Sequence, residues 1–276
     1  METKKKTTKA SQPFLRWAGS KRQLIPVLSR FWNNDYERYV EPFAGSACLF
    51  FSLSPKKALL SDINRELINT YKQVATDVDS VLKELKKLKK GKKDYYRIRS
   101  LNPETLNPNE RAARFIYLNR YCFNGLYRTN SKGKFNVPYC GDERGVMPPD
   151  EIFILASGLL KNAKLHANGY EETLKKVKLG DFVYIDPPFS VRAKEIFNEY
   201  DASKFSSEDI RHLRTWMLKL DKLGVSFLVS YAESEEADLL KKGFYWDTVS
   251  VRRSIAGFTT SRKRVNEIII SNRNMF

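Results

Sequence analysis

The tetrapeptide Asp186-Pro187-Pro188-Phe189 combines residue types that could do chemistry. It follows the apolar run 182–185, which predicts a buried strand, and ligands of open α/β sheets bind just beyond the carboxyl ends of such strands. The two prolines cannot extend a strand ladder, and they fix the backbone so that one carboxylate, one carbonyl and one ring project into a pocket. Asp186 and the Pro187 carbonyl would each accept a hydrogen bond from an amino group, while the Phe189 ring would stack on a planar heterocycle.

Such a site suits the exocyclic amine of adenine or cytosine, whose lone pair is delocalised into the ring. Two acceptors that hold the amine protons favour a pyramidal nitrogen, and its lone pair can then attack an electrophilic methyl group. In the alternative interpretation, the prolines merely end a strand and Asp186 caps the segment that follows. The elements around the motif have to distinguish these two interpretations.

The composition points to a partner with many negative charges. The 276 residues are enough for one large α/β domain, with or without an insertion, and 42% of them are apolar, so a core can form without disulfides. The 49 Lys and Arg residues outnumber the 32 Asp and Glu residues, which leaves a formal net charge of +17. A charge of this size favours nucleic acid as a partner over an ordinary solvated basic surface.

The cysteines and histidines favour neither a metal nor a disulfide framework. Cys48, Cys122 and Cys140 have no CxxC spacing, and His166 and His212 occur singly in a predicted strand and a predicted helix. No run of about 18 apolar residues is present, so we expect no membrane contact. We therefore expect a cytoplasmic protein in a reducing compartment, without a metal and monomeric in solution.

A second group of motifs lies in the N-terminal part. Segment 39–46 predicts a strand, a tight turn at Gly45 and the start of a helix, and the next apolar run, 58–60, ends at Asp62. A glycine turn after one strand and an acid after the next form the layout of a dinucleotide site, in which the acid holds ribose hydroxyls. Only one glycine of G-x-G-x-x-G is present, so a nucleoside without phosphates, such as S-adenosylmethionine, fits better. Lys21 precedes a helical pattern and could hold a carboxylate.

A third region has the pattern of a base-reading surface. A helix over 110–121 is followed by a break at 124–125 and by a predicted β-hairpin of 126–129 with 134–137. A two-stranded ribbon fits the major groove of DNA, where an arginine can bond O6 and N7 of guanine. A packed hairpin with surface arginines is the alternative.

Alternating strands and helices predict a doubly wound, Rossmann-like α/β sheet. We expect 13–70 and 162–276 to form the catalytic domain that binds S-adenosylmethionine, and 71–161 to form a helical, hairpin-bearing insertion that recognises its target. Residues 1–12 predict a disordered basic arm, and the loop 253–264 a contact with phosphates.

These stretches together resemble the Dam-like DNA adenine-N6 methyltransferases, the alpha group of amino methyltransferases. In that D12 class the cofactor motif precedes the recognition region, and the D-P-P-aromatic motif comes last. The resemblance rests on FLRWAGSK (14–21), EPFAG (41–45), DIN (62–64), LNRYCFNGLYR (118–128), FNVPY (135–139), DPPF (186–189) and VRRSI (251–255).

The resemblance implies that S-adenosylmethionine methylates an adenine that flips out of double-stranded DNA into the Asp186 pocket. Lys21 would meet the methionine carboxylate of the cofactor, and Asp62 its ribose hydroxyls. The catalytic residues would be Asp186, Pro187, Pro188 and Phe189. The residues around the cofactor would be Trp17, Ala18, Gly19, Lys21, Glu41, Pro42, Phe43, Ala44, Gly45, Ser46, Asp62, Ile63 and Asp186.

The same resemblance implies a recognition site on DNA. Phe123 would fill the gap that the flipped base leaves, and Arg128 would read a guanine of GATC. The residues in contact with DNA would be Phe123, Asn124, Leu126, Arg128, Asn136, Pro138, Arg252 and Arg253.

Four positions depart from the family pattern. Ser20 and Ala47 stand where the family commonly has glycine, which should tighten the cofactor site and change its affinity for the cofactor. Phe189 and Phe123 replace tyrosines, and both keep the ring. The alternatives to an adenine-N6 enzyme are a DNA-binding protein that has lost catalysis, a cytosine-N4 enzyme, and a methyltransferase that acts on a protein amide.

Overall fold

The computed structural model describes residues 12–188, 205–254 and 262–274. The predictions made for residues 1–11 of the basic arm and for Phe189 lie outside this range. Arg252 and Arg253 belong to a strand, but their side chains also lie outside the described part of the structure.

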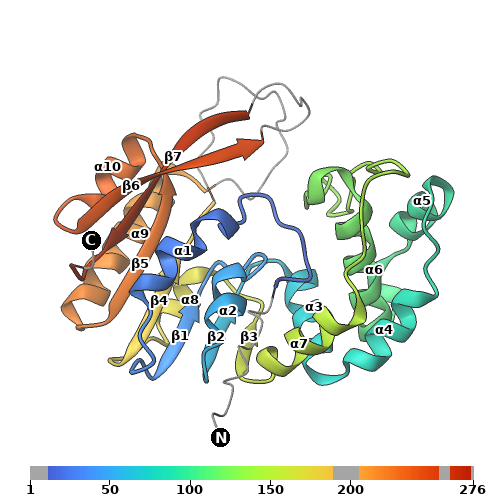
Figure 1. The fold of residues 1–276 in the computed structure, drawn as a ribbon, viewed down its shortest axis with the longest axis horizontal. Helices are drawn as coiled ribbons and strands as arrows, with labels where there is room; N and C mark the ends of the chain where they lie inside the picture. Colours follow the sequence, from blue (N-terminus) through green and yellow to red (C-terminus); the bar gives the residue numbers. More distant parts are fainter. Residues whose placement is uncertain (1–11, 189–204, 255–261, 275–276) are drawn as a thin grey trace, which may run out of the picture.

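In the described residues, strands β1 to β7 form one sheet in the order β3-β2-β1-β4-β5-β7-β6 (Figure 1). The strands from β3 to β5 in this order run parallel, and β7 is antiparallel to both of its neighbours. The order reverses between β1 and β4, and the crevice of a doubly wound sheet opens at such a point. The bounds are β1 Arg38–Glu41, β2 Ala58–Ser61, β3 Ala163–His166, β4 Asp181–Ile185, β5 Ser226–Ala232, β6 Tyr245–Ser254 and β7 Arg262–Ser271.

Helices cover both faces of this sheet, because successive residues of its central strands point to opposite sides. Tyr39 and Tyr184 join the core on one face, whereas Val40 and Val183 join the core on the other. The first face packs against α1 (Ile25–Leu28), α2 (Cys48–Leu53) and the helices between β2 and β3; the second packs against α8 (Tyr170–Leu174), α9 (Ser207–Lys222) and α10 (Glu235–Lys241). The predicted doubly wound α/β fold is confirmed.

The helices between β2 and β3 stand beside the sheet, on the side away from α9 and α10 (Figure 1). They are α3 (Arg65–Thr76), α4 (Val78–Lys86), α5 (Lys92–Ser100), α6 (Pro108–Tyr121) and α7 (Asp150–Leu160), with 3-10 turns at η3 (Pro103–Thr105) and η4 (Phe123–Gly125). Their apolar side chains belong to the same core as the first face of the sheet. The predicted boundaries between the catalytic domain and the recognition insertion (71–161) therefore stay a prediction.

The start of α6 shows why this segment is helical. The side chain of Asn107 accepts hydrogen bonds from the backbone of Asn109 and Glu110, the Glu110 carboxylate accepts one from the Asn107 backbone, and Pro108 takes the first position. Such a capping box satisfies amide groups that have no partner within the helix.

The predicted hairpin is present, but it does not contain regular strands. Isolated antiparallel bridges join Thr129 to Phe135 and Cys122 to Tyr139. At the turn, the side-chain oxygen of Asn130 accepts hydrogen bonds from the backbone of Lys132 and Lys134, each at 3.0 Å. A side chain that bonds the backbone in this way competes with the strand ladder, so the prediction of two regular strands was wrong.

The helix predicted after Lys21 is also interrupted. It forms as η1 (Arg22–Leu24), α1 (Ile25–Leu28) and η2 (Ser29–Phe31), with Pro26 in the first turn of α1. These short turns bury Leu24 and Leu28, and Lys21, which precedes them, contacts Asp186 at the end of β4.

Candidate active site

Carboxyl groups gather where the central strands end. Glu41 is the last residue of β1, Asp62 follows β2 directly, and Asp186 follows β4. Because β1, β2 and β4 are parallel neighbours, their carboxyl ends lie at the same edge of the sheet. The three acids therefore surround the point at which the strand order reverses.

Asp186 is held by two partners on one of its two oxygens. The ammonium of Lys21 lies 2.7 Å from Oδ1, and the hydroxyl of Ser230 donates to the same Oδ1 at 3.0 Å. The contacts that described residues make with this carboxylate are both on Oδ1. The side chain is 20% exposed, so Oδ2 can accept a hydrogen bond from a substrate.

Pro187 and Pro188 continue the chain away from the strand. Pro187 is buried and Pro188 is exposed. Neither residue has a backbone N–H, so this segment offers carbonyl acceptors and no donor. The acceptor pair predicted from the sequence, Asp186 and the Pro187 carbonyl, thus lies at the end of β4.

Lys21 is buried between acidic side chains. Its ammonium is 3.9 Å from Oε2 of Glu267 on β7, in addition to its contact with Asp186, and only 5% of its side chain is exposed. It also donates to the Gly19 carbonyl at 3.2 Å. The role of Lys21 at a cofactor carboxylate stays a prediction. Its contact with Asp186 was not predicted from the sequence.

The turn after β1 is tied to the acid after β2. Asp62 accepts a hydrogen bond from the backbone N–H of Gly45 at 3.0 Å and another from Asn64 at 2.9 Å. The hydroxyl of Tyr71 donates to the Gly45 carbonyl at 2.6 Å. A Cβ atom on Gly45 would lie 2.8 Å from the Trp17 ring, so no other residue fits there without a shift.

Burial changes the protonation of two of these acids. It raises the pKa of the Glu41 carboxyl well above its usual value, although a hydrogen bond from Tyr39 at 3.0 Å opposes the shift. Burial also raises the pKa of Asp62, against its two backbone hydrogen bonds. Burial therefore favours the protonated form of the Glu41 carboxyl.

The other residues predicted around the cofactor differ in burial and in their contacts. Ser46 is buried and donates to the Ser20 hydroxyl at 3.2 Å, and Ala44 bonds the backbone of Ser61. Phe43 is packed on Tyr170, with ring centroids 5.2 Å apart. The remaining predicted residues are Pro42, which is buried, and Ala18, Gly19 and Ile63, which are exposed.

Six of the predicted DNA contacts lie on the irregular hairpin. The backbone N–H of Phe123 donates to the Pro138 carbonyl, which closes the base of the hairpin. The guanidinium of Arg128 donates through Nε to Oδ1 of Asn136 at 2.8 Å. Asn124, Arg128 and Pro138 are exposed, whereas Phe123, Leu126 and Asn136 are half-buried. The structure therefore brings these six residues together.

The last turns of α6 and the hairpin contact residues 16 and 17, which precede Lys21 of the candidate active site. The Asn119 side chain bonds both the N–H and the carbonyl of Arg16, at 2.8 and 2.7 Å. The ring of Trp17 is stacked on that of Tyr127. Neither Asn119 nor Tyr127 was predicted to make these contacts, although both lie within a stretch that carries the resemblance.

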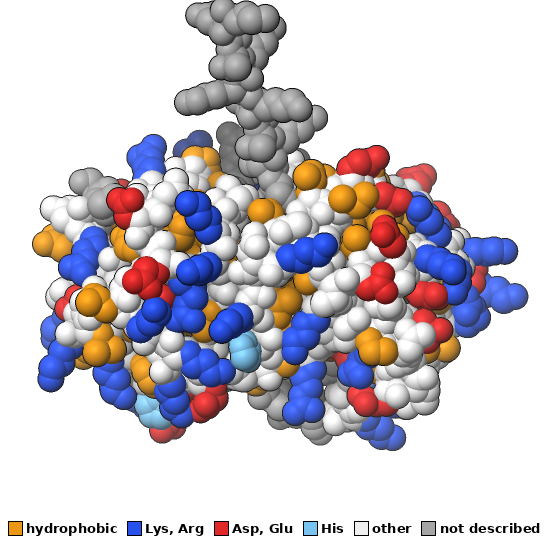
Figure 2. All heavy atoms as spheres, turned by 90° about the horizontal axis from the view of Figure 1, so that it is seen from below, with side chains coloured by type: hydrophobic (Ala, Val, Ile, Leu, Met, Phe, Trp, Pro, Cys, Tyr) orange, Lys and Arg blue, Asp and Glu red, His pale blue; other side chains and the backbone are white. Residues whose placement is uncertain are grey.

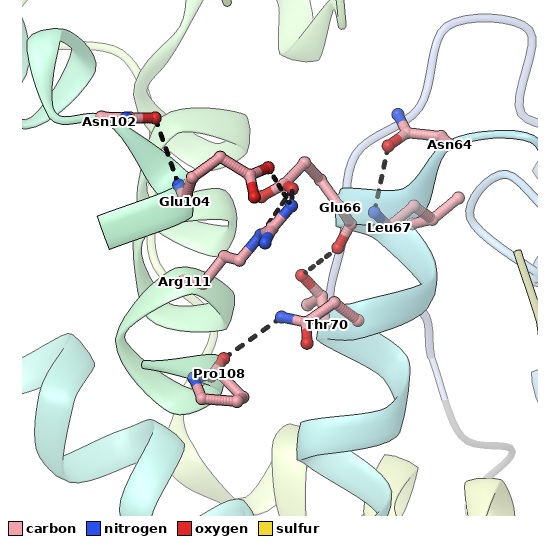
Figure 3. A network of polar contacts seen from close by, with 9 residues as sticks. Asn64, Glu66, Leu67, Thr70, Asn102, Glu104, Pro108 and Arg111 are labelled. Carbon is pink, nitrogen blue, oxygen red and sulfur yellow. Dashed lines mark hydrogen bonds and ion pairs between the residues drawn. The ribbon is translucent and has the colours of Figure 1, made fainter. Parts of the chain in front are cut away.

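A polar network holds α6 to α3, the helix that begins three residues after Asp62 (Figure 3). Arg111 of α6 binds Glu66 of α3 through its guanidinium and also reaches Glu104 at 3.2 Å. The hydrogen bond with Glu66 raises the pKa of Arg111, so the arginine stays charged. Asn64 caps α3 by accepting from the Leu67 N–H at 3.1 Å. These contacts fix the helices that carry the hairpin relative to Asp62.

The positive charge is spread over the surface. Figure 2 shows Lys and Arg side chains distributed across the face seen from below, with fewer Asp and Glu among them.

In the described residues, no group of three or more His, Cys, Asp or Glu side chains could hold a metal ion, and no helix is long and apolar enough to cross a membrane. Burial raises the pKa of the Cys48 thiol to about 11, so this thiol is not ionised near neutral pH.

The fold and the site define a class of enzyme. A doubly wound sheet with an acidic crevice and an Asp-Pro-Pro segment at the point of strand reversal is the arrangement of a methyltransferase that acts on an amino group. Residues 17–255 match the family described as D12 class N6 adenine-specific DNA methyltransferase. The chain belongs to this family.

Three relatives agree with this assignment. The chain is 36% identical over 270 residues to the type II methyltransferase M1.LlaDCHI of Lactococcus lactis subsp. cremoris, a match that covers 95% of each chain. It is 33% identical over 287 residues to the type II methyltransferase M.MjaIII of Methanocaldococcus jannaschii, covering 95% of this chain and 99% of the relative. It is 30% identical over 270 residues to the DNA adenine methylase of Escherichia coli K12, with 95% of each chain covered.

The protein is therefore an adenine-specific DNA methyltransferase whose substrate is DNA. This assignment disagrees with the alternatives of a cytosine-N4 enzyme and of a methyltransferase for protein amides.

Proposed function

We propose that this enzyme transfers a methyl group from S-adenosylmethionine to N6 of an adenine flipped out of double-stranded DNA, within the sequence GATC. The observation that carries the proposal is the position of Asp186 and its prolines at the end of β4, beside the turn of Gly45 and Asp62. An acceptor for the target amine and a turn suited to a nucleoside thus share one crevice.

The groups in the crevice suit S-adenosylmethionine. Asp62 and Asp186 follow the strands on either side of β1, and carboxylate groups there would favour the positive charge of a sulfonium. Gly45 has no Cβ, which allows the Trp17 indole to pack directly on the turn, and this ring would form one wall of the nucleoside site. We assign Asp62 to the ribose hydroxyls and Lys21 to the methionine carboxylate. When bound, the cofactor supplies an electrophilic methyl group.

The residues at the end of β4 would activate the amine. Oδ2 of Asp186 and the Pro187 carbonyl accept the two N–H bonds of adenine N6, which localises its lone pair. The new N–C bond forms as the S–C bond of the donor breaks, and N6 then loses one proton. The products are N6-methyladenine, S-adenosylhomocysteine and a proton.

The hairpin would read the sequence. The exposed guanidinium of Arg128 is oriented by its hydrogen bond to Asn136. An arginine oriented by such a bond can donate to the O6 and N7 acceptors of guanine. The resemblance to the Dam-like enzymes favours GATC, with Phe123 filling the gap left by the flipped adenine. We further propose that 71–161 serve target recognition, and that 13–70 and 162–276 serve catalysis.

The proposal is tested by incubating the full-length protein with labelled S-adenosylmethionine and duplexes that contain either GATC or a scrambled sequence. Nucleoside analysis of the product should show N6-methyladenine in the GATC duplex alone. Transfer to other sequences would keep the chemistry and overturn the GATC assignment. Duplex binding without any transfer would instead favour a protein that has lost catalysis.

A further inference from the structure

A chain of two buried hydroxyl groups ends on the catalytic carboxylate. Tyr184 of β4 and Ser230 of β5 are buried, with 1% and 0% of their surfaces exposed. Their oxygens lie 2.8 Å apart, and the Ser230 hydroxyl lies 3.0 Å from Oδ1 of Asp186. The three residues therefore form one continuous row of hydrogen bonds.

The direction of these hydrogen bonds follows from the number of protons. Ser230 donates its single hydroxyl proton to Oδ1 of Asp186, so it has no second proton to donate. The hydroxyl of Tyr184 must then donate to Ser230. Burial raises the pKa of Tyr184 well above its usual value, so the tyrosine keeps the proton that it donates.

Ser230 is better suited than Lys21 to fix the carboxylate during a reaction cycle. Lys21 is assigned above to a cofactor carboxylate as well, so its contact with Asp186 depends on what is bound. Ser230 is neutral and lies in a central strand, where it is paired with Ile269 of β7 and flanked by β4. Its position does not depend on the ligand.

We infer that Ser230 is a positioning residue for the methyl-transfer reaction, with Tyr184 supporting it from behind. By binding Oδ1, Ser230 fixes the rotation of the Asp186 carboxylate, so that Oδ2 is presented in one direction to the amine of the target adenine. This inference rests on the proposed function. A displacement of about 1 Å at a reacting group costs about a hundredfold in rate, so orientation of this kind has a measurable effect.

The test compares Ser230→Ala with the wild-type enzyme in single-turnover and steady-state methylation of a GATC duplex. We expect kcat and the single-turnover rate to fall about tenfold to a hundredfold, with the KM values for S-adenosylmethionine and DNA within about twofold of wild type. Ser230→Thr keeps the hydroxyl and should restore most of the rate. Tyr184→Phe should lower kcat less, because Ser230 can still donate.

Thr173→Val is the matched control. Thr173 is also buried, and its hydroxyl has two partners, Ser61 at 2.6 Å and Asn168 at 3.1 Å, but it lies on α8 and has no contact with Asp186. We expect this variant to lose stability and to keep kcat. Thermal melting of each variant verifies that it folds.

The wild-type measurement separates a failure of the proposed function from a failure of the positioning role of Ser230. Absence of transfer by the wild-type enzyme would overturn the proposed function itself. With active wild type, a folded Ser230→Ala variant with unchanged kcat, or with the same loss as Thr173→Val, would overturn the positioning role alone.

Discussion

The indole of Trp17 is stacked on the ring of Tyr127, with their centroids 6.3 Å apart and their planes at 15°. Trp17 also contacts the turn at Gly45, whereas Tyr127 belongs to the hairpin that we assign to DNA. A single pair of rings thus connects the candidate cofactor site with the candidate recognition site. A substitution that removes one of the two rings therefore changes the packing of the other ring.

Tyr127→Ala should weaken the binding of S-adenosylmethionine about twofold to tenfold, since a stacked aromatic pair contributes about 0.5–1.5 kcal/mol. Isothermal titration calorimetry measures this affinity directly. Tyr96→Ala is the control, because Tyr96 is also 36% exposed but packs on Arg99 of the same helix, α5. Equal losses in the two variants would contradict a specific link through Trp17.

Asp186→Ala should abolish methylation while duplex binding is largely retained. The variant removes the acceptor for the amine, but it leaves the hairpin and its contacts unchanged. Filter binding and labelled methyl transfer measure the two properties on the same samples. Asp247→Ala, an exposed residue of β6, should behave as wild type. Turnover by the Asp186→Ala variant would rule out the catalytic assignment.

Arg128→Ala should relax the discrimination at one guanine by about 1–3 kcal/mol, since one bidentate contact to a base is worth this much. Competition between duplexes with single substitutions in GATC identifies the position. Lys132→Ala, at the tip of the hairpin, should weaken binding to all sequences by a similar amount, as expected for a phosphate contact. If Arg128→Ala also acts uniformly, Arg128 binds a phosphate and not a base.

Gly125→Ala should destabilise the protein by about 2–4 kcal/mol, the sum of a left-handed backbone and of overpacking. Gly125 has φ +66°, and a Cβ atom there would lie 2.6 Å from Cβ of Arg16. Gly133 has φ +70° but no atom within 4 Å of such a Cβ. Gly133→Ala should therefore cost only about 1–2 kcal/mol. Urea denaturation measures both; equal costs would show that the contact with Arg16 relaxes freely.

Glu41→Gln should change how stability depends on pH. The pKa of Glu41 is raised in the folded protein by burial, from an ordinary value of 4.5. The folded state therefore keeps a proton that the unfolded chain releases, and stability falls as pH rises from 4.5 towards the folded-state pKa. The slope is about 1.4 kcal/mol per pH unit within that window.

The Gln variant cannot ionise at this position, so its melting temperature relative to wild type should rise as the pH increases above 4.5. Glu37→Gln serves as the control, because the exposed Glu37 carboxyl has a pKa lowered by Lys178. A difference that stays flat with pH would mean that Glu41 is already ionised in the folded protein.

The central elements of the fold were predictable because they follow from local patterns. An uninterrupted apolar run such as 182–185 has to be buried on both sides, and it is. Gly45 and Asp62 were predicted to follow successive strands, and the structure joins them by a hydrogen bond. The alternation of strands with helices predicted a doubly wound sheet, but it did not predict the order of the strands.

Contacts between distant residues were not predictable in this way. Ser230 is one polar residue in a buried strand, and nothing near it in the sequence marks its bond to Asp186. Ala47 adopts φ +50° at a position where the family commonly has glycine. The alanine therefore has a strained backbone conformation, which the sequence alone does not show. The irregular hairpin depends on hydrogen bonds to the Asn130 side chain. The alternation of residue types along the sequence does not predict these bonds.

The single core shared by the sheet and α3 to α7 limits how new sequence specificity can arise in this enzyme. These helices cannot be exchanged for those of a relative without rebuilding the core, because their apolar residues pack with Tyr39 and Tyr184. Residues 128–136 are different: they carry both Arg128 and Asn136, and Phe135 packs on Tyr127 within the hairpin itself. If Arg128 reads a base as proposed, we expect a transplant of this short segment that keeps Phe135 to change the recognised bases without rebuilding the core.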